Sequence, residues 1–287
     1  MKIIIGKTSG FCGGVQNAVI KTEKELNNNK SDIYCLGEIV HNKQVIENLK
    51  RQGLKVIENI EDAKGKTIIR AHGVPKEIYN KAKEQNIELV DLTCPKVVKI
   101  HDIAEEYANK GYFVILVGVE EHPETIGTIS FCGNDHYLIR NINDIKFAIE
   151  KIKNSGIKKV LVISQTTYSL AKFNNIIEKL KENLGNDYEL EIKNTICSAT
   201  KMRQEETEEL SKIVDFMIIV GGKNSSNTKK LYEISKTNCS NVILVETADE
   251  INFDNIKKYE TIGIMAGAST PKESVEEIKN KLNKYGD

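Results

Sequence analysis

The sequence predicts an α/β fold of three similar αβα lobes arranged as a pseudo-threefold trefoil. Two observations lead to this prediction. Short β-branched runs alternate with longer amphipathic, charged segments of helical period, which is the pattern of parallel βαβ units. The clearest runs are residues 66–69, 112–117, 159–164 and 216–220. The second observation is that the same four elements recur three times along the chain, in the same order.

Each copy of the repeat begins with a strand, a cysteine and a helix, in GKTSGFCGGVQNAV, VDLTCPKVVKIHD and KNTICSATKMRQEE. A glycine-bearing strand end then passes into a helix, in LGEIVHNKQVIENL, GVEEHPETIGTI and GGKNSSNTKKLYEI. A short strand with an acidic tail follows, in VIENIEDA, LIRNINDI and LVETADEI. The copy closes with a strand, a polar turn and a helix, in IIRAHGVPKEIY, LVISQTTYSLAK and IGIMAGASTPKES.

The repeat divides the chain into lobes of residues 14–95, 96–195, and 196–287 together with 1–13. Length alone would also allow two domains of ordinary size. Three similar lobes can close around an axis so that equivalent loops meet at the centre. Ligand sites in open parallel sheets lie beyond the carboxyl ends of the strands. The sequence therefore predicts one site that is lined by all three lobes.

The composition favours a small-molecule partner. The chain has 41 basic and 41 acidic side chains, a balance that would attract neither a nucleic-acid backbone nor an anionic membrane surface. We find neither a secretion signal nor an apolar run of membrane-spanning length, and we expect a cytoplasmic protein. Six scattered cysteines are too few for a disulfide framework, so we expect free thiols or metal ligands.

Cys12, Cys94 and Cys197 occupy the same position of the repeat, at a strand end just before a helix. A helix N-terminus stabilises the thiolate that a metal requires. Structural zinc is usually closed by four ligands in close pairs, and no such pair exists here. In a cubane cluster, three cysteines leave one iron open as a Lewis acid beside an electron reservoir. The sequence thus predicts one [4Fe-4S] cluster per subunit at the centre of the trefoil. The remaining cysteines share no position and are interpreted as packing or surface residues: Cys35, Cys132 and Cys239.

Polar residues occupy two further positions of the repeat. His41, His122 and Ser225 share the second position, and the last position is shared by His72, Thr166 and Ser269. Each of the four prolines follows a candidate site residue within one to three positions, where a helix can start. Backbone N–H groups, hydroxyls and imidazoles at several helix starts suit a phosphate or diphosphate. Neither a Walker loop nor a G-x-G-x-x-G motif occurs, so a nucleotide site is not supported.

Three side chains could serve either structure or proton transfer. Glu124 could be a carboxylate favoured by a helix dipole, and beside an open iron it is also the best proton donor. Thr166 and Thr167 could cap the following helix, although their place in the repeat favours a relay. His101 and His136 have no counterparts in the other copies, so we interpret both as structural residues.

At these residues the chain resembles the family of 4-hydroxy-3-methylbut-2-enyl diphosphate reductases. The resemblance rests on motifs that follow the family's order from the first residues to the last: GFCGGV, EIVHN, RAHGVP, TCP, HPE, SQTT, SAT, SSN and AGAST. It implies a trefoil around a [4Fe-4S] cluster held by Cys12, Cys94 and Cys197. It also implies that an allylic alcohol diphosphate loses its hydroxyl, giving isopentenyl and dimethylallyl diphosphates, in the last step of the non-mevalonate pathway.

The resemblance also assigns roles to the polar residues. Glu124 and Thr166 would handle protons, with Thr167 and Gln165 close by. An electron donor such as ferredoxin or flavodoxin would supply the reduction. The residues implied to bind the substrate are His41, His72, His122, Thr166, Thr167, Ser225, Ser226, Asn227 and Ser269.

Two other interpretations stay open on the sequence. A three-lobed synthase of the quinolinate type also uses three cysteines and an open iron, although the HPE, SQTT and SSN turns argue against it. A non-catalytic redox or metal sensor would bind a cluster and use the polar turns only as helix caps. Turnover of an allylic diphosphate distinguishes these possibilities.

Overall fold

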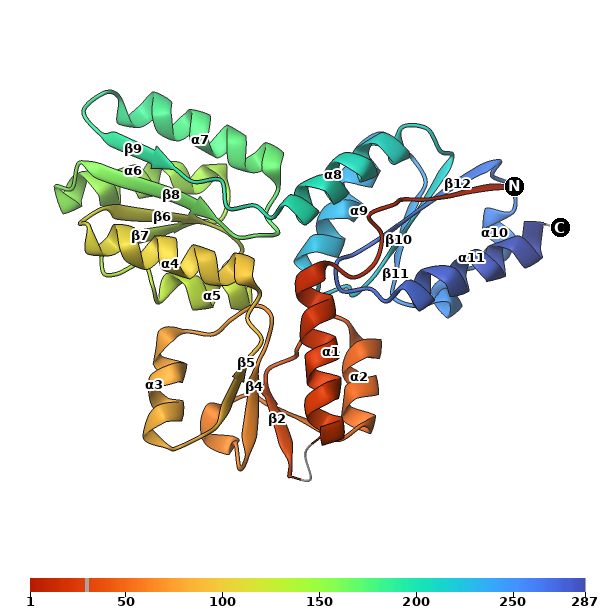
Figure 1. Ribbon diagram of the computed structural model, residues 1–287. Coiled ribbons are helices and arrows are strands. Elements are labelled where there is room, and N and C mark those ends of the chain that lie inside the picture. Colours follow the sequence, from red (N-terminus) through yellow and green to blue (C-terminus); the bar gives the residue numbers. More distant parts are fainter. Residues whose placement is uncertain (29–30, 287) are drawn as a thin grey trace. The chain divides into compact units, whose positions relative to one another are not determined.

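The computed structural model describes residues 1–28 and 31–286 and divides into two compact units. The first unit comprises Met1–Ile20, Val40–Gln52 and Ser198–Asp287, and the second comprises Lys21–Ile39 and Gly53–Cys197. Within the described residues, the strands form three parallel four-stranded sheets, which Figure 1 shows with their helices. The predicted α/β class is therefore confirmed.

The first unit contains one sheet, in the order β1-β12-β10-β11. Its strands are β1 (Lys2–Ile5), β10 (Phe216–Val220), β11 (Val242–Val245) and β12 (Thr261–Ala266). The N-terminal strand pairs with the last strand of the chain, with Ile5 opposite Ile264. Helices of this unit are α2 (Lys43–Arg51), α8 (Ser198–Ser211), α9 (Ser226–Asn238), α10 (Phe253–Ile256) and α11 (Lys272–Gly286), with a 3-10 turn at Ala248–Glu250. Helix α1 (Gly13–Asn28) runs from the first unit into the second.

The second unit contains two sheets. The sheet in the order β3-β2-β4-β5 has the strands β2 (Ile33–Leu36), β3 (Leu54–Ile57), β4 (Lys66–Ile69) and β5 (Leu89–Asp91). The sheet in the order β7-β6-β8-β9 has the strands β6 (Phe113–Val117), β7 (His136–Ile139), β8 (Lys159–Ser164) and β9 (Glu189–Ile192). The helices are α3 (Lys76–Glu84), α4 (Pro95–Asn109), α5 (Pro123–Ile129), α6 (Ile145–Ser155) and α7 (Leu170–Leu184), with 3-10 turns at Ile60–Asp62 and Ile142–Asp144.

All three sheets share one topology. In each, the strand that leads to a repeat cysteine lies at an edge: β1 precedes Cys12, β5 precedes Cys94 and β9 precedes Cys197. The strands of each sheet fall within one of the lobes 14–95, 96–195, and 196–287 with 1–13. The lobe boundaries and the pseudo-threefold arrangement stay predictions, since the two compact units do not test them.

The β6–β9 sheet shows how burial positions the site. Along β6 the side chains alternate: Phe113, Ile115 and Val117 pack with α6 and α7, whereas Val114 and Leu116 pack toward α4. Figure 1 shows α4 and α5 on one side of this sheet and α6 and α7 on the other. A strand that is buried on both faces is continuously apolar. The polar residues therefore begin where the strand ends.

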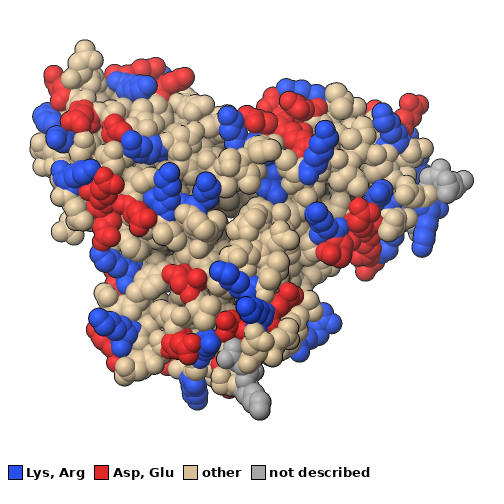
Figure 2. Space-filling view, in the orientation of Figure 1, with Lys and Arg blue, Asp and Glu red and all other residues tan. Residues whose placement is uncertain are grey.

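The charged surface is mixed in sign. On the face shown in Figure 2, Lys and Arg side chains lie among Asp and Glu side chains. Many are paired, as in the Lys212–Glu208 bridge at 2.6 Å. No helix within the described part of the chain has both the length and the hydropathy to cross a bilayer.

Candidate active site

The three repeat cysteines have the same local geometry. Cys12, Cys94 and Cys197 each directly precede a helix, α1, α4 and α8 respectively. In each case the cysteine N–H donates a hydrogen bond of 3.0 Å to a turn that follows a strand. The acceptors are the carbonyl oxygens of Ala268, Ala71 and Thr166, in that order. None of the three cysteines is in a disulfide and all three are partly exposed, so each thiol can reach a ligand.

The other three cysteines lie in different surroundings. Cys35, Cys132 and Cys239 are buried free thiols. Burial raises the pKa of both Cys35 and Cys132 to about 12. A neutral buried thiol is a packing residue and a poor metal ligand. This placement agrees with the role that the repeat predicts for them.

The last position of the repeat is shifted by one residue in the middle copy. Thr166 is equivalent to Ala71 and Ala268, because all three accept the N–H of a repeat cysteine. Thr167 is therefore the residue that aligns with His72 and Ser269. Spacing predicts Thr166, because it is as far from Cys94 as Ser269 is from Cys197, but the middle copy has one more residue than the last copy between its cysteine and its strand end.

The second position also shifts, in the first copy. His122 is the N-cap of α5 and Ser225 is the N-cap of α9, but the N-cap of α2 is Asn42. His41 lies one residue before that cap, because the loop after β2 is one residue longer than its counterparts. The predicted alignment of His41 with His122 and Ser225 is thus correct from the strand end and wrong from the helix start.

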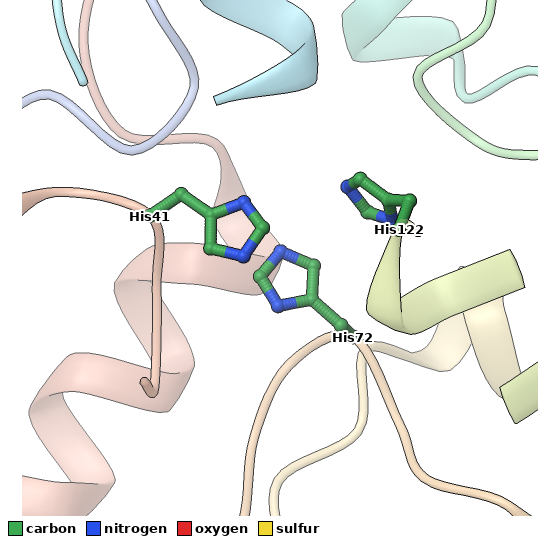
Figure 3. A group of neighbouring side chains, drawn as sticks. All are labelled: His41, His72 and His122. Atoms are coloured by element: carbon green, nitrogen blue, oxygen red, sulfur yellow. The ribbon is translucent and has the colours of Figure 1, made fainter. Parts of the chain in front are cut away.

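The His122 ring is fixed by a hydrogen bond to the start of its own helix. Its Nδ1 accepts the Glu124 N–H at 3.2 Å, so a neutral ring carries its proton on Nε2. The His72 ring meets it edge-on, with centroids 5.3 Å apart and an interplanar angle of 87°. Figure 3 shows His122 at the start of α5 and His72 in the loop after β4, both in the second unit.

Two hydrogen bonds join Glu124 and Thr166. The Thr166 N–H donates to Glu124 Oε1 at 2.6 Å, and the Thr166 hydroxyl donates to Oε2 at 2.6 Å. Glu124 is only 2 % exposed. Burial raises its pKa to about 7, although the two hydrogen bonds from Thr166 oppose the rise. A carboxyl group with this pKa can release and recover a proton near neutral pH.

The pair also fixes where the proton sits. Oε1 always accepts the backbone N–H of Thr166, so the proton of a neutral Glu124 must lie on Oε2. It then faces the Thr166 Oγ1, which accepts it and can donate its own proton onward. The Thr166 carbonyl accepts the Cys197 N–H at 3.0 Å. The Glu124–Thr166 pair therefore lies in contact with the turn that accepts the Cys197 N–H.

Gln165 links the loop after β6 to the turn after β8, a role that the sequence did not predict. Its Oε1 accepts the Val119 N–H at 3.0 Å, and its Nε2 donates to Thr167 Oγ1 at 2.9 Å. The side chain is 1 % exposed. Its place just after a buried strand is the only sequence signal, and the Val119 partner follows a different strand.

In the first unit, polar groups of Ser269, His41 and Asn227 were predicted to bind the substrate. The Ser269 hydroxyl donates to the His41 carbonyl at 3.1 Å. A Cβ at Gly222 would lie 2.4 Å from that same oxygen, so only glycine allows this approach. Asn227 is 3 % exposed, and neither its Oδ1 nor its Nδ2 has a hydrogen-bond partner among the described residues. Such an amide is costly unless a ligand completes its hydrogen bonds.

His101 has a structural position, as expected. It is 5 % exposed and stacks on Phe131 with centroids 4.3 Å apart. Burial lowers its pKa to about 4. His136 lies near the surface, with Nδ1 2.8 Å from the Gly133 carbonyl.

The low pKa of His101 predicts a pH-dependent stability. The folded state keeps the ring neutral while the unfolded state binds a proton below about pH 6.5, so stability is complete above that pH and falls between 6.5 and 4. We expect His101→Leu to remove about 2 kcal/mol of this acid sensitivity. Urea unfolding of both proteins at pH 7 and pH 4.5 measures it. Equal pH dependence in the two proteins would contradict the assignment.

Comparisons with known proteins agree on one family. Residues 3–283 match the family model described as LytB protein. The 4-hydroxy-3-methylbut-2-enyl diphosphate reductase of Alkaliphilus oremlandii is 41% identical over 99% of both chains. The reductase of the same name from Clostridioides difficile is 41% identical over 97% of this chain and 98% of its own.

Two solved structures are also similar. The structure of the E-1-hydroxy-2-methyl-but-2-enyl-4-diphosphate reductase of Plasmodium falciparum has a TM-score of 0.91 at 31% identity, covering 98% of this chain and 88% of its own. The second is titled as (E)-4-hydroxy-3-methyl-but-2-enyl diphosphate reductase, the terminal enzyme of the non-mevalonate pathway. It has a TM-score of 0.71 at 35% identity, covering 99% of this chain and 100% of its own.

Proposed function

Since the chain belongs to the LytB protein family, we propose that it reduces 4-hydroxy-3-methylbut-2-enyl diphosphate to isopentenyl and dimethylallyl diphosphates. The substrate gains two electrons and two protons, and its hydroxyl leaves as water. The observation that carries the proposal is the buried Glu124–Thr166 pair, because it places an acid with a pKa of about 7 next to the Cys197 turn. An acid is what a hydroxyl needs in order to leave.

The three repeat cysteines are proposed to hold one [4Fe-4S] cluster. Their thiols fit this group, because none of the three is in a disulfide, and all three are partly exposed and lie at helix starts, where negative charge is stabilised. A bound cluster would supply electrons and Lewis acidity at an iron that no cysteine ligates. The electrons are proposed to come from a donor such as ferredoxin or flavodoxin.

The diphosphate is proposed to bind to polar groups at the repeat positions. Nε2 of neutral His122 is a donor, which suits a phosphate oxygen and does not suit a metal ion. The buried Asn227 amide has free hydrogen-bonding capacity within the described residues. The other proposed ligands are His41, His72, Thr166, Thr167, Ser225, Ser226 and Ser269.

Glu124 and Thr166 are proposed to deliver the proton to the leaving hydroxyl. Proton transfer from Glu124 Oε2 to Thr166 Oγ1, and from Oγ1 to the hydroxyl, would leave a carboxylate that both Thr166 hydrogen bonds stabilise. Gln165 would hold the neighbouring Thr167 hydroxyl in place.

The experiment that tests the function is anaerobic turnover. Protein reconstituted with iron and sulfide is mixed with the substrate and a reduced viologen, and the products are analysed by mass spectrometry. We expect both five-carbon diphosphates. A protein that binds the cluster and the substrate but gives no product under these conditions would contradict the proposal and favour a non-catalytic sensor.

Asn227→Ala should weaken substrate binding without destabilising the unliganded protein. Removal of an amide without partners leaves the unliganded fold as stable or more stable, whereas the substrate loses a hydrogen bond of about 1.5–3 kcal/mol, or roughly 10- to 100-fold in affinity. Calorimetric titration of the oxidised protein and thermal unfolding measure the two effects. Asn238→Ala is the matched control, because Asn238 ends the same helix and bonds to the Ile234 carbonyl at 3.0 Å. Equal affinity in wild type and Asn227→Ala would place the anion elsewhere.

A further inference from the structure

The loop before Cys12 is the longest connection between an edge strand and a repeat cysteine. It spans residues 6–11, whereas residues 92–93 and 193–196 make the other two connections. A longer connection has more conformations to lose before its thiol is fixed. Holding Cys12 in one place therefore requires contacts that the shorter connections can do without.

Two side chains of α8 supply such contacts from within the first unit. The Glu206 carboxylate accepts the Lys7 N–H at 2.6 Å and the Thr8 N–H at 2.8 Å, and the Thr8 hydroxyl also donates to it. One turn earlier, Arg203 donates from Nη2 to the Gly10 carbonyl at 2.6 Å. Arg203 and Glu206, three residues apart on one face of α8, thus hold both halves of the loop before Cys12.

The character of these bonds indicates a firm attachment. Arg203 is 4 % exposed, and its Nη1 donates to the Ala199 carbonyl on its own helix at 3.3 Å, so the guanidinium is fixed at both ends. Burial would raise the pKa of Glu206, but the hydrogen bonds from Thr8 and Lys7 outweigh it and hold that pKa below its ordinary value. Bonds to ionised groups are about twice as strong as neutral ones.

The loop conformation is one that needs support. Gly10 has φ +102°, which other residues rarely adopt. The Ser9 hydroxyl accepts the Ala266 N–H at 3.1 Å, and Cys12 N–H reaches Ala268. These contacts attach the loop to β12 and the turn after it, while Arg203 and Glu206 attach it to the helix packed beside that sheet.

We propose that Arg203 and Glu206 are positioning residues that fix the Cys12 loop and so present the Cys12 thiol for ligation. The cluster part of this inference rests on the proposed function, whereas the effect on the thiol does not. Helix α8 starts at Ser198, directly after Cys197. One helix therefore follows one proposed ligand and restrains the loop that carries another.

The test measures thiol reactivity in the metal-free protein. Glu206→Gln keeps the shape of the side chain but loses a charge and an acceptor for the Thr8 donors. We expect iodoacetamide to modify Cys12 about tenfold faster in this variant, the effect of one lost charge-assisted bond. Cys94 and Cys197 in the same molecule should react at wild-type rates, as peptide mass spectrometry would show. After reconstitution, a chelator should remove iron from the variant faster than from wild type.

Two further variants make the outcome decisive. Thr8→Val removes only the hydroxyl bond from the loop side and should show a smaller change in the same direction. Glu205→Gln is the control. Glu205 lies on the same helix, but its side chain is exposed and forms a long ion pair with Lys201, at 3.7 Å. Unchanged Cys12 reactivity in both Glu206→Gln and Thr8→Val would overturn the proposal, as would equal acceleration at all three cysteines. Selective acceleration at Cys12 in a protein that binds no cluster would support the anchor and refute the proposed function instead.

Discussion

Serine at Cys12, Cys94 or Cys197 is expected to abolish cluster binding. A serine hydroxyl stays protonated where a cysteine gives a thiolate, so one iron would lose its protein ligand. The three positions share the same backbone hydrogen bond and the same place before a helix, and each variant should therefore fail to the same degree. Iron and sulfide content after anaerobic reconstitution, together with the visible spectrum, measures the loss.

The buried cysteines provide the matched controls. Serine at Cys35, Cys132 or Cys239 should leave iron content unchanged and lower the free energy of unfolding by about 1–2 kcal/mol, the cost of a hydroxyl in an apolar core. Cys132→Ser and Cys239→Ser should be mild, because the Thr128 carbonyl lies 3.3 Å from the Cys132 sulfur and the Asn241 carbonyl lies 3.3 Å from the Cys239 sulfur. Equal iron loss in both sets would refute the register of the repeat.

Glu124→Gln is expected to lower turnover by roughly a hundredfold or more, the scale of a lost general acid. The amide preserves the local structure, because its oxygen can accept the Thr166 N–H and its nitrogen can donate to the Thr166 hydroxyl. Cluster content and substrate affinity should therefore stay near wild type. Steady-state assays and calorimetric titration separate the two effects. Glu121→Gln, at an exposed neighbouring position, should behave as wild type.

The pH profile gives the same residue a second signature. With a pKa of about 7 in the folded protein, Glu124 carries its proton below that pH and loses it above. The kcat/KM of the wild type should therefore fall as the pH rises through about 7. The Glu124→Gln variant should lack this limb. Near-normal turnover of the variant would remove Glu124 from the mechanism, and loss of the cluster would give it a structural role.

The sequence predicted the strands well because their burial makes them continuous apolar runs. Strands β4, β8 and β10 have the predicted bounds, and β6 begins one residue later than expected. The cysteine position of the repeat also agrees in all three copies, because strand, cysteine and helix are adjacent in the chain. Loops of unequal length shifted the alignment of Thr166 and His41 by one residue, and spacing alone cannot locate an inserted residue.

The sequence could not predict which residues from distant segments contact one another. Glu124 and Thr166 were both candidates, but their two hydrogen bonds and the resulting proton position depend on neighbouring strands. Arg203 and Glu206 gave no signal at all, because charged residues on an amphipathic helix usually face solvent. Only the fold shows that Arg203 is buried against the Gly10 carbonyl.

The central claim is that three equivalent cysteines hold an iron-sulfur cluster in this chain. Metal analysis and the visible spectrum of protein purified without oxygen test it most directly. We predict a brown protein with about four irons per chain, which loses colour and iron in air because one iron has no cysteine ligand. A colourless protein that carries one equivalent of zinc and no iron would contradict the claim.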